Sequence, residues 1–322
     1  MKKLMIVLSA IAAAVGFTAT AKADITVSGS SNVAYLSTAG DGSNDEELAV
    51  GNIVSFGMST TTSGGIGISS SMALSTDYDG NNSQAVDGGN SVTFTTGGAT
   101  IVVGDVEISD TIGSVGGVVN GPLDDASDLD SSVGTGFVDD DGTGVELTTA
   151  MGAASLNISY VSNDDTDNFG ALNSSAAGDD SAMSASITMP FGAYSATIGV
   201  ADSDTGESSS GASASGTLGG GTVTIGYSNV TTIAANADIT TAGDSEVLGA
   251  TYVMAMDADT TISVGYQSAK DADSESHTRT DLSVERALGG GATVYLDLRN
   301  LTGDTAANMD GTAIAFGTSV AF

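Results

Sequence analysis

The 322-residue sequence has no cysteine, two prolines, one histidine and only 7 basic residues. Without cysteine it can form no disulfide bond, thiol nucleophile or cysteine metal site. Pro122 and Pro190 are the only prolines, so few positions interrupt an extended strand. The 40 acidic residues give a formal net charge of −33, which makes nucleic acid an unfavourable partner. Stability therefore has to come from another source, such as a closed β-sheet.

The N-terminal residues predict a secretory signal peptide over residues 1–23. Met1 to Lys3 is basic, Leu4 to Phe17 is mostly apolar, and Ala21 to Ala23 has the small-x-small form that precedes cleavage. The apolar stretch is shorter than the ~20 residues that a spanning helix needs. We therefore expect an exported mature chain of residues 24–322.

Alternation of apolar and polar residues recurs through the mature chain. Examples are Val54, Phe56 and Met58, and later Ile262, Val264 and Tyr266. The 44 glycines would suit a disordered chain, but this alternation and a hydrophobic content of 40% argue against disorder. No sustained helical stripe of apolar residues occurs. We count about 16 strands by this period of two, the last of which ends on Phe322 and closes the sheet against Ile25 and Val27.

The connections between the expected strands alternate between short and long. Short glycine turns are predicted at residues 61–64, 96–98, 190–192, 218–220 and 289–291, and long polar connections at 37–48, 77–89, 106–141, 162–180, 229–244 and 270–276. Short turns on one rim and long loops on the other are typical of a transmembrane, antiparallel, up-and-down β-barrel. Small polar residues such as Asn157 and Thr224 occupy the opposite faces, as a water-filled lumen requires. Four aromatic residues lie near short turns, where they could form an interfacial aromatic girdle, namely Phe191, Tyr194, Tyr252 and Phe322.

Three stretches and the C-terminal aromatic residue carry a family resemblance. Residues Ser55 to Ser69 (SFGMSTTTSGGIGIS), Ala99 to Asp105 (ATIVVGD) and Leu288 to Ala292 (LGGGA) resemble hairpins of general bacterial porins, particularly the alphaproteobacterial type. The resemblance implies a Gram-negative outer-membrane barrel, a homotrimer, and assembly machinery that recognises Phe322. It also implies that the long connection of about residues 106–141 is a constriction loop folded into the lumen.

The long connection is rich in carboxylates, and its length alone suggests either a functional or a disordered segment. Taken singly, each carboxylate could belong to a solvated acidic loop. By the resemblance some of them line the narrowest part of the channel, and the candidates near the middle of the loop are Asp124, Asp125, Asp128 and Asp130.

The four basic residues of the mature chain lie between Lys270 and Arg299. If Gly289 to Gly291 form a turn with Leu288 opposite Ala292, then Asp281 faces Arg299, and opposite charges meet across the strands. The lumen-wall candidates on these two strands are Arg279, Asp281, Glu285, Asp297 and Arg299. The resemblance suggests that Arg279 and Arg299 lie across from the acidic loop.

Other chemistries find little support in the sequence. His277 has no second imidazole or cysteine to share a metal, and no serine partner for hydrolysis can be identified. We expect no enzyme activity and no cofactor, although the acidic external loops could bind divalent cations loosely.

The expected function is an outer-membrane channel for passive diffusion of ions and small hydrophilic solutes, with a preference for cations. Its expected partners are outer-membrane lipid, lipopolysaccharide, the barrel-assembly machinery and two further copies of the chain. The alternative is a secreted, acidic, calcium-binding β-rich adhesin or surface-layer protein, which would explain the acidity and the signal peptide but not the alternating connections.

Overall fold

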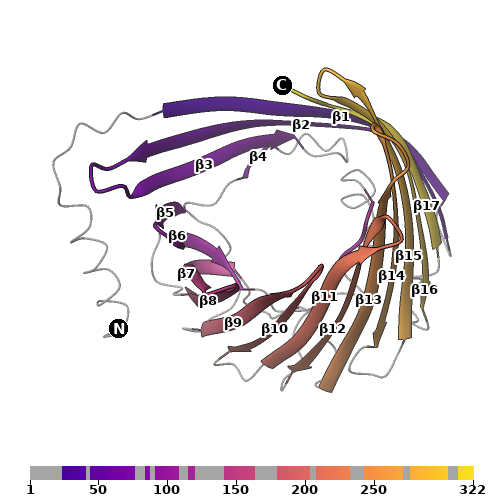
Figure 1. The fold of residues 1–322 in the computed structure, drawn as a ribbon. Coiled ribbons are helices and arrows are strands. Elements are labelled where there is room, and N and C mark those ends of the chain that lie inside the picture. The colour runs from indigo at the N-terminus through magenta and orange to yellow at the C-terminus, as the bar shows by residue number, and fades with distance from the viewer. Residues whose placement is uncertain are drawn as a thin grey trace.

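The computed structural model describes residues 24–40, 44–76, 84–87, 91–108, 115–119, 141–163, 180–203, 208–232, 243–270, 276–303 and 311–322. In these ranges the chain forms one antiparallel sheet that closes on itself, because β1 (Asp24–Gly40) pairs with both β2 (Asn44–Thr61) and β17 (Gly311–Ala321) (Figure 1). Apart from two short strands that share one position, elements that follow one another in the sequence are neighbours in the sheet. The up-and-down barrel expected from the alternation is confirmed.

The strands are β1 (Asp24–Gly40), β2 (Asn44–Thr61), β3 (Gly67–Thr76), β4 (Gln84–Asp87), β5 (Val92–Thr96), β6 (Ala99–Glu107), β7 (Asp141–Met151), β8 (Ala154–Asn163), β9 (Asp180–Phe191), β10 (Tyr194–Ser203), β11 (Ser208–Leu218), β12 (Gly221–Thr232), β13 (Gly243–Ala255), β14 (Thr260–Lys270), β15 (Ser276–Gly289), β16 (Ala292–Gly303) and β17 (Gly311–Ala321). β4 and β5 both pair with β3, so they share one position in the wall. The barrel consequently has 16 strand positions, the number predicted from the sequence.

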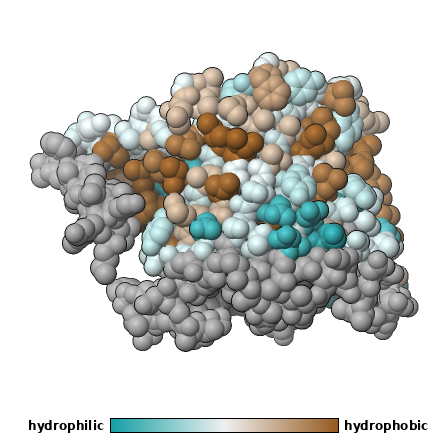
Figure 2. All heavy atoms as spheres, turned by 90° about the horizontal axis from the view of Figure 1, so that it is seen from below, coloured by the Kyte–Doolittle hydropathy of each residue, from teal (hydrophilic) through white to brown (hydrophobic). Residues whose placement is uncertain are grey.

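Apolar side chains alternate between the two faces of the wall as the sequence pattern predicts. Ile225, Leu248 and Phe316 are 54%, 55% and 60% exposed on the outer face, whereas Ala313 and Ala315 are fully buried on the inner face. Figure 2 shows one side of the barrel, with hydrophobic residues gathered in a band across that face. A sheet with this outer face is suited to contact with lipid.

The aromatic residues expected near the short turns lie at that rim. Phe191 and Tyr194 flank the turn between β9 and β10, and their rings stack with centroids 6.0 Å apart. The Tyr252 hydroxyl donates a hydrogen bond to the Leu218 carbonyl at 3.1 Å, beside the turn between β11 and β12. These contacts place aromatic side chains where a membrane interface would meet the barrel.

The predicted long connection at residues 37–48 is wrong. β1 continues to Gly40 and β2 begins at Asn44, with Ala39 opposite Asn44. The polar composition of these residues suggested a loop, but paired strands satisfy their backbone groups, and composition alone does not end a strand. A smaller difference occurs at the turn between β15 and β16, where Gly289 rather than Leu288 lies opposite Ala292, because the register shifts between Ala287 and Gly289.

The last residue completes the closing seam. The Phe322 amide donates to the Gly29 carbonyl at 2.9 Å, and the Gly29 amide donates to the Phe322 carbonyl at 3.1 Å. β17 pairs with Ser30 to Gly40, so the closing contact lies further along β1 than Ile25 and Val27, the residues that the sequence suggested. The difference reflects the stagger of strands in a barrel, which alternation cannot reveal.

The expected signal peptide, residues 1–23, lies outside the described residues. No helix in the described ranges is long and apolar enough to cross a membrane.

Candidate functional site

The five lumen-wall candidates share the inner face of β15 and β16. Asp281 lies opposite Arg299, as the turn counting predicts. The next pairs toward the short-turn rim are Ser283 with Asp297, and Glu285 with Tyr295. Arg279 is the next inward residue beyond Asp281 in the direction away from the short-turn rim, and it lies opposite Leu301.

Asp281 is the centre of a charged cluster, which we call the wall cluster and define as Arg279, Asp281 and Arg299. Asp281 Oδ1 accepts a hydrogen bond from Arg299 Nε at 3.0 Å, and Oδ2 accepts one from Arg299 Nη2 at 3.4 Å. Arg279 Nε lies 3.6 Å from Asp281 Oδ2. This two-pronged contact fixes the planar guanidinium of Arg299 against the carboxylate.

The wall cluster is covered. Arg279, Asp281 and Arg299 are 4%, 1% and 0% exposed, and Asp297 beside them is fully buried. The sequence suggested arginines on the water-filled side of the wall, but the structure places both under other groups. Their positive charge is therefore shielded from lumen water and partly compensated by Asp281.

The covering group is a short piece of the long connection, residues 115–119, which we call the inner segment. The Val118 amide donates a hydrogen bond to Asp281 Oδ2 at 3.3 Å. Val115 is 7% exposed, and Val119 packs against a buried group formed by Ala34, Leu36, Tyr295, Ala313 and Ala315. The inner segment thus contacts the wall from β13 to β1.

The start of the connection lies at a different part of the wall. Ile108 follows β6 and is buried with Val106, Val161, Ala182 and Ala201, which belong to β6, β8, β9 and β10. The inner segment lies against β13 to β16, away from β6 and β7 (Figure 1). Residues 115–119 of the connection between β6 and β7 therefore lie inside the barrel, as the resemblance to porins implied for this connection.

Glycine residues line the contact between the inner segment and the wall. A Cβ atom added to Gly249 would lie 2.9 Å from Val115 Cβ, and one added to Gly265 would lie 3.3 Å from Val118 Cγ2. A Cβ on Gly117 would lie 2.6 Å from Arg299 Nη2. The backbone of the segment approaches the wall this closely because these positions carry no side chain.

Carboxylates at other inward positions keep contact with solvent. Glu47 is exposed and shares the inner face with the buried Ala49. Glu146 and Glu285 are partly exposed, and Glu146 accepts a hydrogen bond from the Thr148 hydroxyl at 3.4 Å. Negative charge on the described inner face is thus more accessible than positive charge.

A side-chain hydrogen bond on the inner face also spans the seam where the first and last strands meet. The Tyr295 hydroxyl donates to Asn32 Oδ1 at 2.6 Å, so β16 is joined to β1 past the intervening β17. Tyr295 is 3% exposed. This bond holds the wall beneath Val119.

Five residues singled out in the sequence contribute no described side chain to this site. Asp124, Asp125, Asp128 and Asp130 lie outside the described residues. His277 is in β15, opposite Gly303, and nothing further is described of its side chain. In the parts of the chain that the structure describes, no group of three or more potential metal ligands occurs.

The residues missed by sequence reasoning are those of the inner segment and its contact surface, namely Val115, Gly117, Val118, Val119, Gly249 and Gly265. One signal was present. The sequence Gly113 to Val119 (GSVGGVV) is small and apolar within an otherwise acidic connection, which is the composition expected of a piece that packs on a wall.

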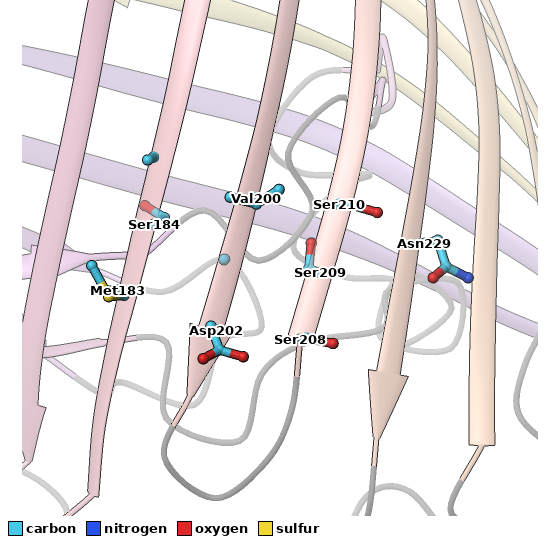
Figure 3. A pocket seen from close by; sticks show the side chains of 10 residues that line it. Met183, Ser184, Val200, Asp202, Ser208, Ser209, Ser210 and Asn229 are labelled. Carbon is cyan, nitrogen blue, oxygen red and sulfur yellow. The ribbon is translucent and has the colours of Figure 1, made fainter.

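A depression of about 400 Å³ lies across β9 to β12 (Figure 3). Its lining combines the exposed Met183 and Val200 with the buried Ser184, Ala201 and Ser209. Short serine and alanine side chains leave the strands thinly covered there. We interpret the depression as part of the wall and assign it no chemistry.

Comparison with known proteins identifies this architecture. A sequence model described as Gram-negative porin matches residues 9–306, whereas no curated protein sequence matches the chain. Among solved structures, the anion-selective porin from Comamonas acidovorans superposes with a TM-score of 0.69 at 13% identity, covering 94% of this chain and 100% of that one. A loop-deletion mutant of OmpT from Vibrio cholerae gives 0.70 at 13% identity, covering 93% and 99%, and a mutant of the Rh. blastica porin gives 0.61 at 16% identity, covering 93% and 100%. The structural matches show the fold, and the match over residues 9–306 shows that the chain belongs to the Gram-negative porin family.

Proposed function

We propose that this porin is a cation-preferring channel through which ions and small hydrophilic solutes cross the outer membrane by passive diffusion. The porin family and the closed barrel support an outer-membrane channel rather than an enzyme. The preference for cations depends on which charged side chains reach the water in the lumen.

The unequal exposure of inward charges carries this proposal. Arg279 and Arg299 are buried beneath the inner segment, whereas Glu47, Glu146 and Glu285 retain solvent contact. Fixed negative charge in a narrow passage raises the local concentration of cations and lowers that of anions. The Comamonas acidovorans porin is described as anion-selective. Because a porin with this fold can be anion-selective, the fold alone does not imply a preference for cations, and the charges on the inner face must decide the selectivity.

The acidic loop is expected to add to this effect. We propose that Asp124, Asp125, Asp128 and Asp130 line the narrowest part of the channel, since the inner segment that precedes them already lies against the wall inside the barrel. Replacing the four with asparagine should lower the cation preference. An unchanged reversal potential would remove them from the constriction.

The test is a reversal-potential measurement with purified protein in planar bilayers under a potassium chloride gradient. The wild type is expected to show stepwise conductance and a reversal potential of the cation-selective sign. Glu47→Gln and Glu285→Gln should shift that potential toward zero. Glu246→Gln is the matched control, because it removes the same charge outside the channel. Glu246 is exposed on the outer face, opposite Lys270.

Targeting and assembly form part of the proposal. We expect residues 1–23 to act as a cleaved signal peptide, the barrel to form a homotrimer in contact with lipid and lipopolysaccharide, and Phe322 to be recognised by the barrel-assembly machinery. The external loops would bind divalent cations only loosely. A mature N-terminus at Asp24 and a slower-folded trimer band on unheated gels are the expected observations.

The alternative is a secreted calcium-binding adhesin or surface-layer protein. The exposed apolar band on the outer face favours the membrane channel, because such a surface would be unfavourable in water. Recovery of the protein from the medium rather than the membrane fraction, without conductance, would favour the adhesin.

A further inference from the structure

The glycines of this barrel fall into two groups, because two different physical requirements favour glycine at these positions. Those at short turns, such as Gly98 and Gly152, have positive φ values of 121° and 68° and open space around them. Gly249, Gly265 and Gly117 have no such φ, so any residue could adopt their backbone conformation. What these three positions require is the absence of a side chain.

The two wall glycines lie directly under the inner segment. A Cβ on Gly249 would lie 2.9 Å from Val115 Cβ and 3.0 Å from the Val115 carbonyl oxygen. A Cβ on Gly265 would lie 3.3 Å from Val118 Cγ2. Carbon atoms pack best at about 3.5–4.0 Å, so a single methyl group at either site requires movement of up to about 1 Å.

The inner segment is the part that can move. Gly249 and Gly265 belong to strands that are paired on both sides, β13 with β12 and β14, and β14 with β13 and β15. Residues 115–119 belong to no strand. Displacement of an unpaired segment breaks fewer hydrogen bonds than displacement of a strand within the ladder.

We propose that Gly249 and Gly265 are positioning residues that set how close the inner segment lies to the wall, and thereby set the free cross-section of the channel. A side chain at either position would push the segment into the lumen. This inference depends on the channel function proposed above and extends it to the residues that determine the size limit for solutes.

The test compares the wild type with Gly249→Ala and Gly265→Ala. We expect both variants to have a lower single-channel conductance in planar bilayers. In liposome-swelling assays with sugars of increasing size, the largest permeant sugar should be lost first and the smallest should change little. The reversal potential should stay close to that of the wild type, since no charge is altered.

Two other glycines provide matched controls. Gly116→Ala makes the same change in the inner segment itself, where the added Cβ would meet no described residue within 4 Å other than its chain neighbours. Gly67→Ala makes it in a strand, where the added Cβ would lie 3.7 Å from Thr95 Cβ, an ordinary contact. Both are expected to keep the wild-type conductance and size limit.

A double-mutant cycle tests the contact itself. Val118→Ala removes both methyl carbons that a Cβ on Gly265 would approach, at 3.3 and 3.6 Å. It should restore the conductance of Gly265→Ala but not that of Gly249→Ala, which meets Val115. Such specific rescue is a sign of direct coupling between two positions.

The outcomes separate this inference from the channel proposal. A wild-type protein that forms no channel contradicts the channel function. A conducting wild type whose folded Gly249→Ala and Gly265→Ala variants have the same conductance and size limit contradicts the positioning role alone. If those variants do not fold, Val118→Ala in the wild-type background remains decisive. It should raise the conductance because the segment can lie closer to the wall, and an unchanged conductance would overturn the inference.

Discussion

Asp281 holds together groups from three parts of the chain. Its carboxylate accepts hydrogen bonds from the Arg299 side chain in β16 and from the Val118 amide in the inner segment, and it lies beside Arg279. A buried carboxylate in this position fixes geometry more than it adds net stability, because burying charges costs solvation energy.

Replacing Asp281 with alanine should therefore destabilise the barrel by about 3–5 kcal/mol, the usual cost of removing one partner from a buried ion pair. Arg299 would lose the carboxylate that it contacts at 3.0 Å. Urea unfolding followed by circular dichroism would measure the change in the free energy of unfolding. The double variant Asp281→Leu with Arg299→Met should be less destabilised than Asp281→Ala. The opposite order would mean that the pair contributes net stability.

At the scale of single elements, the turn between β13 and β14 contains the exposed acidic residue Asp257, which lies beyond the ends of the paired strands. The backbone hydrogen bond from Asp259 lowers the pKa of Asp257 below its ordinary value of 3.8, with help from Thr260 and Arg286. The Asp259 amide donates to Asp257 Oδ1 at 2.9 Å, and Arg286 Nη1 lies 3.5 Å from Asp257 Oδ2.

A depressed pKa means that the charged form of Asp257 stabilises the folded turn. This contribution is complete above the ordinary pKa and is lost as the pH falls through the lower, folded-state value. Nuclear magnetic resonance titration of the Asp257 carboxyl in micelles should show a midpoint below 3.8. In an Arg286→Gln variant the midpoint should move only part of the way back, because the backbone hydrogen bond is the larger cause.

The closing strand offers a second prediction at this scale. Phe322 pairs with Gly29 through two backbone hydrogen bonds, and its ring, which lies beside Gly29, is 77% exposed. Phe322→Ser should therefore leave the stability of the barrel refolded in detergent nearly unchanged. It should reduce the amount assembled in cells, because the Phe322 ring is the group that we propose the assembly machinery recognises. If refolding and cellular assembly were impaired equally, the ring would be needed for closure rather than for recognition.

At the scale of the whole molecule, charge is strongly unbalanced. The chain carries 40 acidic and 7 basic residues, and three of the basic ones precede residue 24. On the described inner face, the two arginines are covered while three glutamates reach solvent. Long-range fields of this kind are screened by salt.

The proposed cation preference should consequently weaken as the ionic strength rises. The Debye length falls from about 10 Å at 0.1 M salt to about 3 Å at 1 M, so fixed charges influence less of the channel cross-section. Reversal potentials measured at a constant concentration ratio, with increasing absolute concentration, should approach zero. A preference independent of salt would indicate selection by direct coordination rather than by the field.

Several properties of this barrel could be predicted from the sequence. Alternation with a period of two predicted the faces of β13 to β17, because a strand side chain has only two directions to point. Glycine turns predicted the short rim and the opposition of Asp281 and Arg299, because a tight turn sets the register of its hairpin. The same logic failed at residues 37–48, where polar residues continue as paired strands.

The barrel class, the 16 strand positions and the excess of negative charge follow from the amino-acid sequence, since all three depend on local period, turn chemistry and composition. The burial of Arg279 and Arg299, and the contact of Val115 and Val118 with Gly249 and Gly265, are visible only in the folded barrel. These contacts join residues more than 100 positions apart. Local patterns carry no information about which strand an inward-folding segment will reach, because that depends on how the closed wall is curved and filled.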